Sequence, residues 1–172
     1  MPVIQSLYLA LEAGLPMVAK ETVGLLVGMG VEGDRYARAA GSFSSALPQK
    51  VREVSLITRA GIDAANRQLE AAGFEPYADS ETRRNIVLEG LTSETLNSLV
   101  GQSFYLGSVK LLATELCIPC ERPAKLTSKK HFLKAFENRG GIRASVVESG
   151  NVRVGDLFTC AHESSRFNSK VR

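Results

Sequence analysis

The sequence predicts a β-rich domain, mainly β or α+β, with an antiparallel, barrel-like sheet and a few short helices. Strand-like segments outnumber helical ones along the chain. They come as pairs joined by tight turns and do not alternate with long helices, which argues against a doubly wound parallel sheet. Closing an antiparallel sheet into a barrel removes its unpaired edges, and this favours a barrel-like arrangement.

The first half of the chain is predicted to form three strands, a loop and one long helix. The strands are expected at residues 2–11, 16–27 and 52–57, with a loop of small and polar residues at 38–49. Thr58 stands at the N-cap position of the helix, and Gly73 is expected to end it.

The second half is predicted to contain more hairpins and shorter helices. A strand at 83–90 precedes a short helix within 92–101, and residues 102–116 form a hairpin that turns at Gly107-Ser108. A proline-containing turn and short helices follow. Residues 142–160 are predicted to form a second hairpin with Gly150-Asn151 at its tip.

Length and composition indicate one globular domain, expected at residues 1–160, with a polar and flexible tail at 161–172. The chain has 172 residues, of which 44% are hydrophobic and 23% charged. It has no apolar run of bilayer length, and its net charge of +3 is too small to argue for nucleic acid, so neither a membrane nor a nucleic acid is an expected partner. Three cysteines without a secretory signal favour a reducing, cytoplasmic location.

The stretch GMGVEGDR contains the spacing G-x-G-x-x-G, which occurs in dinucleotide-binding loops. Such a loop needs a helix that starts among the glycines, and the sequence after Gly33 has no long amphipathic pattern. The glycines therefore predict a tight connection with positive φ angles. This connection is expected to expose Glu32, Asp34 and Arg35.

The stretch CIPC, residues 117–120, admits three interpretations. A zinc site needs two further ligands, but Cys160, His131 and His162 have no paired spacing and both histidines are expected to be exposed. A thioredoxin-type redox pair should open a helix in a βαβ context, which the proline and the hairpin context do not match.

The third interpretation is a single reactive thiolate, and we favour Cys120 for it. Arg122 and Lys125 follow closely, and nearby positive charge stabilises a thiolate. Such a group can attack an electrophile, carry sulfur as a persulfide or bind a soft metal. Cys117, next to an apolar strand, is expected to be a small buried side chain, and Cys160 a structural one.

Arginines that precede strands are candidate anion ligands. Arg83, Arg84 and Asn85 stand together at a strand start, and Arg143 follows two glycines. Adjacent strand residues point to opposite faces, so at most one of Arg83 and Arg84 is expected to face a given pocket. The guanidinium groups would bind an anion, and Asn85 would orient a polar group.

Several segments together resemble the MOSC domain family, named after the C-terminal domain of molybdenum cofactor sulfurase. In chain order they are GVEGDRY, SLITRAGI, TRRNIVLEGL with GQSFYLG, CIPCERPAKL and GGIRASVVESGNVRVGDLF. The resemblance extends from the first strand to about Phe158. It implies a β-rich, barrel-like fold and binding of a molybdenum–pterin cofactor (molybdopterin).

The resemblance also implies which residues form the site. Cys120 matches the family cysteine that ligates molybdenum or holds a persulfide, because a basic residue and Lys125-Leu126 follow it. The implied cofactor-binding residues are Arg84, Asn85, Arg143, Arg35 and Arg122. Members are associated with sulfur transfer or with reduction of N-hydroxylated compounds, so the chain is expected to be a sulfur carrier or a molybdenum-dependent oxidoreductase that works with a sulfur-donor or reductase protein.

Two departures from the family pattern leave alternatives open. The residues after GVEGD read RYARAAGSFSS, where some members have a histidine-rich segment, and no separate N-terminal barrel domain precedes the MOSC-like part. The chain could instead be a non-catalytic cofactor carrier, or a thiol redox protein that uses Cys117 and Cys120. The sequence does not choose between molybdenum and tungsten.

Overall fold

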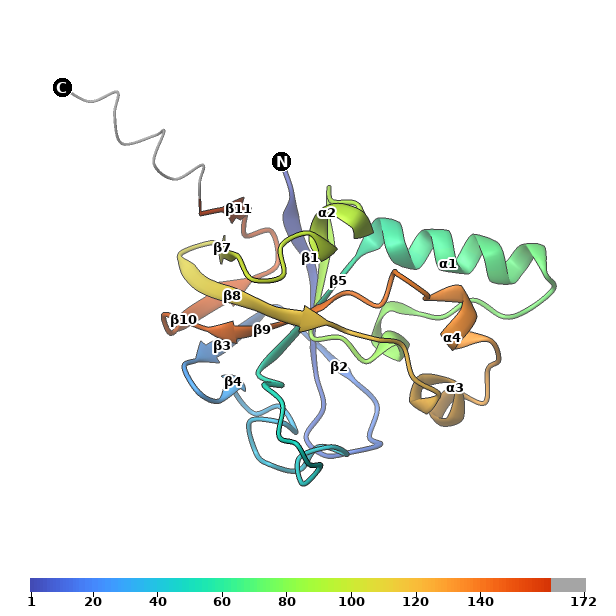
Figure 1. Ribbon diagram of the computed structural model, residues 1–172, viewed down its shortest axis with the longest axis horizontal. Coiled ribbons are helices and arrows are strands. Elements are labelled where there is room, and N and C mark those ends of the chain that lie inside the picture. The colour runs from blue at the N-terminus through green and yellow to red at the C-terminus, as the bar shows by residue number, and fades with distance from the viewer. Residues whose placement is uncertain (162–172) are drawn as a thin grey trace.

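Strands arranged in two sheets dominate the computed structural model, which describes residues 1–161 (Figure 1). The larger sheet has the order β11 (Phe158–Cys160), β7 (Ser103–Leu106), β8 (Val109–Leu116), β9 (Ile142–Val146), β5 (Val54–Thr58), β6 (Ile86–Glu89), β1 (Val3–Leu9) and β2 (Val18–Lys20). The smaller sheet has the order β10 (Gly150–Arg153), β3 (Thr22–Leu26) and β4 (Gly30–Val31). The helical segments are α1 (Arg59–Ala71), η1 (Asp79–Thr82), α2 (Ser93–Asn97), α3 (Arg122–Thr127) and α4 (Phe132–Ala135).

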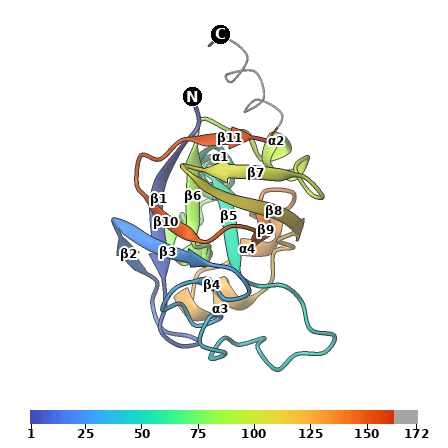
Figure 2. The ribbon, with the colours of Figure 1, turned by 90° about the vertical axis from the view of Figure 1, so that its left-hand side faces the viewer.

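The larger sheet curls until β1 meets the residues that lead into β11 (Figure 2). The backbone N–H of Ile4 donates to the carbonyl of Asp156 at 2.9 Å, and that of Phe158 donates to the carbonyl of Pro2 at 2.9 Å. Neighbouring strands of the described residues are antiparallel except β5 and β6, which α1 connects as a parallel pair. The predicted β-rich, barrel-like fold with few helices is therefore confirmed.

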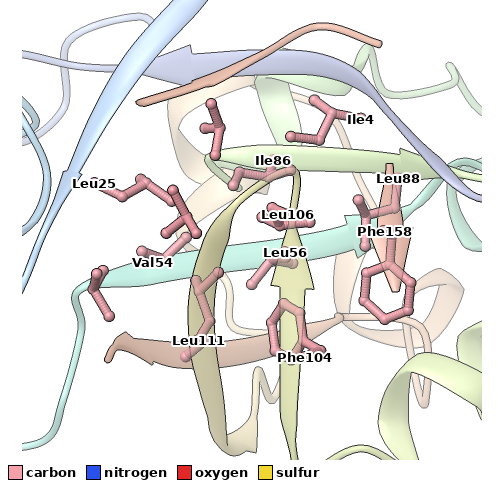
Figure 3. Close-up of a cluster of buried hydrophobic side chains, with 14 of the residues drawn as sticks. Ile4, Leu25, Val54, Leu56, Ile86, Leu88, Phe104, Leu106, Leu111 and Phe158 are labelled. Carbon is pink, nitrogen blue, oxygen red and sulfur yellow. The ribbon is translucent and has the colours of Figure 1, made fainter. Parts of the chain in front are cut away.

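The interior of the curl is an apolar core to which both sheets contribute. Leu56 of β5, Ile86 of β6 and Phe104 of β7 are fully buried in it. Leu25 enters from β3, so the smaller sheet covers the open side of the larger one (Figure 3). Burial of these side chains is the main force that holds the two sheets together.

A second core lies on the outer face of β5 and β6, beneath α1 and α4. Ile57 and Val87 point into it because successive strand residues face opposite sides. They pack with Ile62 of α1 and with Phe132 and Phe136, all fully or almost fully buried. Both faces of β5 and β6 are therefore covered, which fixes the position of the residues at the ends of these strands.

The sequence predicted the ends of α1 and the turn of one hairpin. The Thr58 Oγ1 accepts a hydrogen bond from the Gly61 N–H at 3.0 Å, as expected for an N-cap, and Gly73 has a φ of +79° just after the helix. Strands β7 and β8 pair around Gly107-Ser108 with Leu106 opposite Val109, as predicted. Residues 38–49 form turns and loops, also as predicted.

Two predictions about strands were wrong. Residues 142–160 do not form a hairpin: β9 pairs with β5 and β8, whereas β10 crosses to the smaller sheet, where Gly150 lies opposite Leu25. Gly150 is thus a strand residue, and an added Cβ there would lie 2.8 Å from a methyl group of Val109. The segment 16–27 also splits, because β2 joins the larger sheet and β3 the smaller one.

The polar tail expected from residue 161 onward, with His162, lies almost wholly outside the described residues. Within residues 1–161, no helix combines the length and apolar character that crossing a membrane requires.

Candidate functional site

A cavity of about 80 Å³ lies where β5, β6 and β9 begin and β8 ends. The segments that line it are far apart in the sequence: the loop before β5, the residues before β6, the segment 117–123 and the start of β9. Its lining residues are Arg35, Tyr36, Ser42, Phe43, Arg52, Val54, Ser55, Arg83, Arg84, Asn85, Cys117, Ile118, Cys120, Arg122, Pro123 and Arg143.

Strand register brings the polar residues of the site into one row. Ser55 of β5 lies opposite Arg143 of β9, and Arg143 lies opposite Glu115 of β8. Their neighbours Leu56 and Ala144 point into the inner core, so Ser55 and Arg143 face outward by alternation. The cavity therefore lies on the outer face of the curled sheet.

Arginine is the dominant lining residue. Among residues 1–161, six arginines line this one cavity, and no Asp or Glu does. Because guanidinium groups are weakly hydrated and donate several hydrogen bonds in a fixed plane, such a cluster suits a doubly charged oxyanion such as a phosphate. Mutual repulsion among the arginines is relieved when an anion occupies the space between them.

Arg35 is the most buried of these arginines, with 6% of its surface exposed. Its guanidinium donates to the Asp34 carboxylate at 3.0 Å and to the sulfur of Met17 at 3.2 Å. Asp34, 1% exposed, also accepts the backbone N–H of Ala10 at 3.0 Å. The prediction that this loop exposes Asp34 and Arg35 was wrong, because the two charges pair with each other; Glu32 is exposed as expected.

Gly28, Gly30 and Gly33 have the predicted positive φ angles, and residues 34–39 form turns in place of a dinucleotide-type helix.

Arg83 and Arg84 both line the cavity, contrary to the expectation that only one of them could. Alternation does not apply here because β6 begins only at Ile86 and Arg83 has a left-handed backbone with φ +65°. Arg84 donates to the carbonyls of Gly140 at 2.7 Å and of Thr82 at 3.2 Å. Arg83 donates to the carbonyl of Leu15.

The surroundings of Arg83 disfavour the charged form of its guanidinium group in the folded protein. Burial, followed by the positive charges of Arg35 and Arg122, lowers the pKa of Arg83 from its ordinary value to about 10. The group stays protonated at neutral pH. The unfolded chain binds this proton more tightly, so the contribution of Arg83 to stability improves as the pH rises above about 10.

We expect Arg83→Gln to weaken anion binding without destabilising the free protein. The substitution removes an unfavourable charge together with one hydrogen bond, so the free energy of unfolding should change by less than about 1 kcal/mol. Thermal unfolding in phosphate and in chloride at equal ionic strength measures the anion effect. Phosphate should raise the wild-type midpoint, and the variant should lose at least about half of that rise.

The exposed Arg153 on β10 provides the control. Arg153→Gln removes the same charge away from the cavity and should leave the phosphate effect intact. A full phosphate effect in Arg83→Gln would show that Arg83 does not contribute to anion binding.

Arg143 and Asn85 are held by neighbours within the protein. The Arg143 guanidinium pairs with Glu115, which also pairs with Lys50 at 3.2 Å. Burial alone would raise the pKa of Glu115, but the hydrogen bonds from Arg143 and Lys50 outweigh it and lower that pKa. The Asn85 amide accepts from the Ser55 N–H and hydroxyl at 3.1 and 2.9 Å and donates to the Tyr8 carbonyl at 3.2 Å. These bonds lock the start of β6 against β5 and β1.

The two cysteines of the cavity differ in exposure. Cys120 is exposed at the rim, whereas Cys117 is 4% exposed, and burial was the prediction for Cys117. The Cys117 N–H donates to the Gly141 carbonyl at 2.8 Å, which anchors the segment to the start of β9. Cys160 ends β11 and packs against the inner core, in agreement with a structural role.

Residues 117–120 form no turn, bend or helix, so the turn predicted there was not found; the short helices predicted after it are α3 and α4. Within residues 1–161, no group of three or more His, Cys, Asp or Glu side chains is placed to hold a metal ion, and His131 is exposed.

An aromatic and cationic wall, made of Tyr36, Phe43 and Arg52, separates the cavity from a second and larger groove of about 490 Å³. The Arg52 guanidinium lies 5.0 Å from the ring centre of Phe43 and 6.0 Å from that of Tyr36. Phe43 belongs to the loop of small residues before β5. Displacement of this wall would join the cavity to the groove.

All six residues that the sequence analysis assigned to a site line this cavity: Cys120, Arg84, Asn85, Arg143, Arg35 and Arg122. Sequence reasoning missed Tyr36, Phe43, Arg52 and Ser55. Arg52 carried the same signal as Arg83 and Arg84, since it also stands at the start of a predicted strand. The other three gave no signal, because only strand register and the path of the loop bring them to the cavity.

Comparisons with known proteins agree with this fold. The crystal structure of the YuaD protein from Bacillus subtilis has a TM-score of 0.73 at 19% identity, covering 92% of this chain and 94% of that one. The YiiM protein from Geobacillus stearothermophilus has a TM-score of 0.64 at 15% identity, covering 94% of this chain and 75% of that one. The YiiM protein from Escherichia coli has a TM-score of 0.65 at 18% identity, covering 94% of this chain and 70% of that one. No curated protein sequence matches significantly. The profile of the MOSC domain family matches residues 44–159, which include every lining residue of the cavity from Arg52 to Arg143. The chain therefore belongs to the MOSC domain family.

Proposed function

We propose that this MOSC domain binds a molybdenum–pterin cofactor at the arginine cavity, with Cys120 as the metal ligand or as a persulfide sulfur carrier. The observation that carries the proposal is the lining itself: six arginines and an exposed cysteine share one cavity, and no carboxylate of the described residues lines it. The family is associated with the molybdenum cofactor, which supports the same ligand.

The residues present suit the charged parts of such a cofactor. Its phosphate is an oxyanion that Arg83, Arg84 and Arg122 could hold through charge-assisted hydrogen bonds. A thiolate is a soft ligand and suits molybdenum better than a carboxylate does. A cavity of about 80 Å³ has room for an oxyanion but not for a pterin ring, so the ring would need the neighbouring groove beyond Tyr36 and Phe43.

In this proposal the side chains around the arginine cavity perform two tasks. The arginines bind and orient the anion, and the bonds from Arg84 to Gly140 and Thr82 keep that guanidinium in place before binding. Tyr36 and Phe43 shield the cavity from solvent. When bound, the molybdenum centre would supply two-electron redox chemistry.

Cys120 would perform the chemistry of a sulfur carrier if sulfur transfer is the activity. Its thiolate would attack the outer sulfur of a donor persulfide, forming the Cys120 persulfide and releasing the donor thiolate, so that no external oxidant is consumed. The exposed position of Cys120 allows a donor protein to reach it. As a molybdenum ligand, the same thiolate would support reduction of an N-hydroxylated substrate.

We expect Cys120→Ala to lose molybdenum while retaining pterin. The arginines that hold the phosphate are unchanged, whereas the only exposed thiol at the cavity is removed. The measurement is the molybdenum and pterin content of proteins purified from a cofactor-producing host. Wild type should contain about one of each per chain.

Ile118→Ala is a matched control, because Ile118 belongs to the same segment and is 73% exposed. It should keep both molybdenum and pterin. Loss of neither component from Cys120→Ala would exclude Cys120 as the ligand. Absence of both from the wild type would refute cofactor binding, and mass spectrometry of Cys120 for an added sulfur would then test the sulfur carrier alone.

A further inference from the structure

A basic surface extends from the rim of the cavity across α3 and α4. It consists of Lys125 in α3, Lys130 between the helices and Lys134 in α4, with His131 beside them, and all four are exposed. They line one shallow groove together with Lys129 and the single carboxylate Glu121. We call Lys125, Lys130 and Lys134 the lysine surface.

The lysine surface is continuous with the exposed thiol. A second shallow groove contains Cys120, Glu121, Arg122 and Lys125, so Glu121 and Lys125 belong to both grooves. Cys120 and Arg122 also line the arginine cavity. A molecule that covers the lysine surface would therefore reach Cys120 without crossing another part of the fold.

These lysines are not used in holding the fold together. Lys129, their neighbour, is: its ammonium group pairs with Glu81 at 2.6 Å and donates to the Pro76 carbonyl at 2.8 Å. Within residues 1–161, none of the ion pairs found involves Lys125, Lys130 or Lys134. Their charges thus remain available to an external partner.

Exposed apolar side chains lie among these charges. Ile118 is 73% exposed, Leu126 41% and Leu133 40%. Leu133 lines the groove with the lysines, and Leu126 lines the groove with Cys120. An apolar centre with a charged rim is the usual composition of a protein–protein interface, whereas a surface that only binds small ions needs no apolar part.

We propose that the lysine surface docks a partner protein with an acidic face, which delivers its reactive group to Cys120. The proposal rests on the proposed role of Cys120 as the reacting sulfur. A partner must approach this thiol from solvent, and opposite charge both steers the encounter and fixes its orientation. The arginines inside the cavity act on the small anion, while the lysines outside act on the protein.

Thiol–disulfide exchange with charged peptides tests the docking without knowledge of the natural partner. The probes are two peptides of equal length, one rich in Glu and one of Ser and Gly, each with one cysteine activated as a thionitrobenzoate mixed disulfide. The Cys120 thiolate forms a disulfide with the peptide and releases thionitrobenzoate, whose absorbance gives the rate. Cys120→Ser provides the blank.

The wild type should react about tenfold faster with the acidic peptide than with the neutral one at low salt, and the advantage should disappear at high salt. The triple variant Lys125→Gln/Lys130→Gln/Lys134→Gln should lose most of this advantage, measured as the ratio of the two rates, because a change in the Cys120 thiolate caused by Lys125 would alter both rates alike. A control variant, Lys20→Gln/Lys110→Gln/Arg153→Gln, removes three charges from β2, β8 and β10 and should behave as wild type.

Three outcomes would overturn the proposal. A triple variant that keeps the advantage would assign the attraction to the arginine cavity, and an equal loss in the control would assign it to net charge. Lysine-dependent binding of single-stranded oligonucleotides or phosphatidylserine vesicles without preference for the acidic peptide would replace the protein partner with another ligand. Failure of Cys120 to react with either peptide would instead refute its proposed role, so the two failures are distinguishable.

Discussion

Gly141→Ala is expected to prevent stable folding, with a loss of more than about 4 kcal/mol in the free energy of unfolding. Gly141 has a φ of +84°, which disfavours any side chain, and an added Cβ would lie 1.9 Å from the Leu56 carbonyl oxygen and 2.9 Å from its carbon. Both atoms belong to the backbone of β5, the strand buried on both faces. The strand cannot move away without disrupting the two cores.

Gly101→Ala separates the effect of the contact from that of the backbone angle. Gly101 has nearly the same φ, +86°, but an added Cβ there meets no atom within 4 Å. This control should cost only about 1–2 kcal/mol, the strain of a left-handed alanine. Urea unfolding monitored by circular dichroism measures both variants. Similar losses in the two would show that β5 accommodates the Cβ and that the close approach is unimportant.

The close approach at Gly141 has a functional consequence, since it holds the parts of the cavity together. The Gly141 carbonyl accepts the Cys117 N–H, and the Gly140 carbonyl accepts the Arg84 guanidinium. A Cβ at Gly140 would lie 2.1 Å from the Cys117 carbonyl. Because Gly140 and Gly141 have no side chains, the segment 117–120, the start of β9 and the residues before β6 can approach one another. This approach places the cysteines beside the arginines.

Local signals accounted for most of the elements that the sequence predicted. The N-cap at Thr58, the glycine at 73 and the turn at Gly107-Ser108 each depend on the chemistry of neighbouring residues, and each was found where expected. Gly150-Asn151 carried an equally good turn signal but lies in a strand. The deciding interaction there is the pairing of β10 with β3, more than 120 residues earlier in the chain, which no local pattern reports.

The candidate site shows the same division between residues that local sequence signals predict and residues that only the folded structure brings together. Cys120 stood out because basic residues follow it in a C-x-x-C stretch, and Arg84 and Arg143 stood out because they lie near the starts of predicted strands. Phe43 did not, since the loop that carries it gains its position only from packing against the finished sheet. Arg52 did carry a local signal, because it stands at the start of a predicted strand, but that signal was overlooked. Burial of Asp34 was also not predictable, because a charge is expected to be exposed unless its partner is known.

Asp34→Ala is expected to lower the free energy of unfolding by about 3–5 kcal/mol. The substitution leaves the buried Arg35 guanidinium without its carboxylate and removes the acceptor of the Ala10 N–H, a residue with no exposed surface. It also removes the acceptor of the Tyr36 N–H. Urea unfolding at neutral pH measures the loss. A cost below about 1 kcal/mol would show that solvent or another group replaces the carboxylate.

A double-mutant cycle separates the ion pair from the backbone bonds of Asp34. Arg35→Met alone leaves Asp34 buried without its cation and should also be strongly destabilising, whereas Asp34→Ala/Arg35→Met removes both charges together. Because the unpaired charge is then gone, the double variant should be more stable than the sum of the single losses predicts, by about 2 kcal/mol or more. The loss of stability that remains in the double variant measures the hydrogen bonds that the backbone N–H groups of Ala10 and Tyr36 donate to Asp34. Additive losses would mean that the pair is not coupled, and that Arg35 is held in the cavity by Met17 and the Arg83 carbonyl instead.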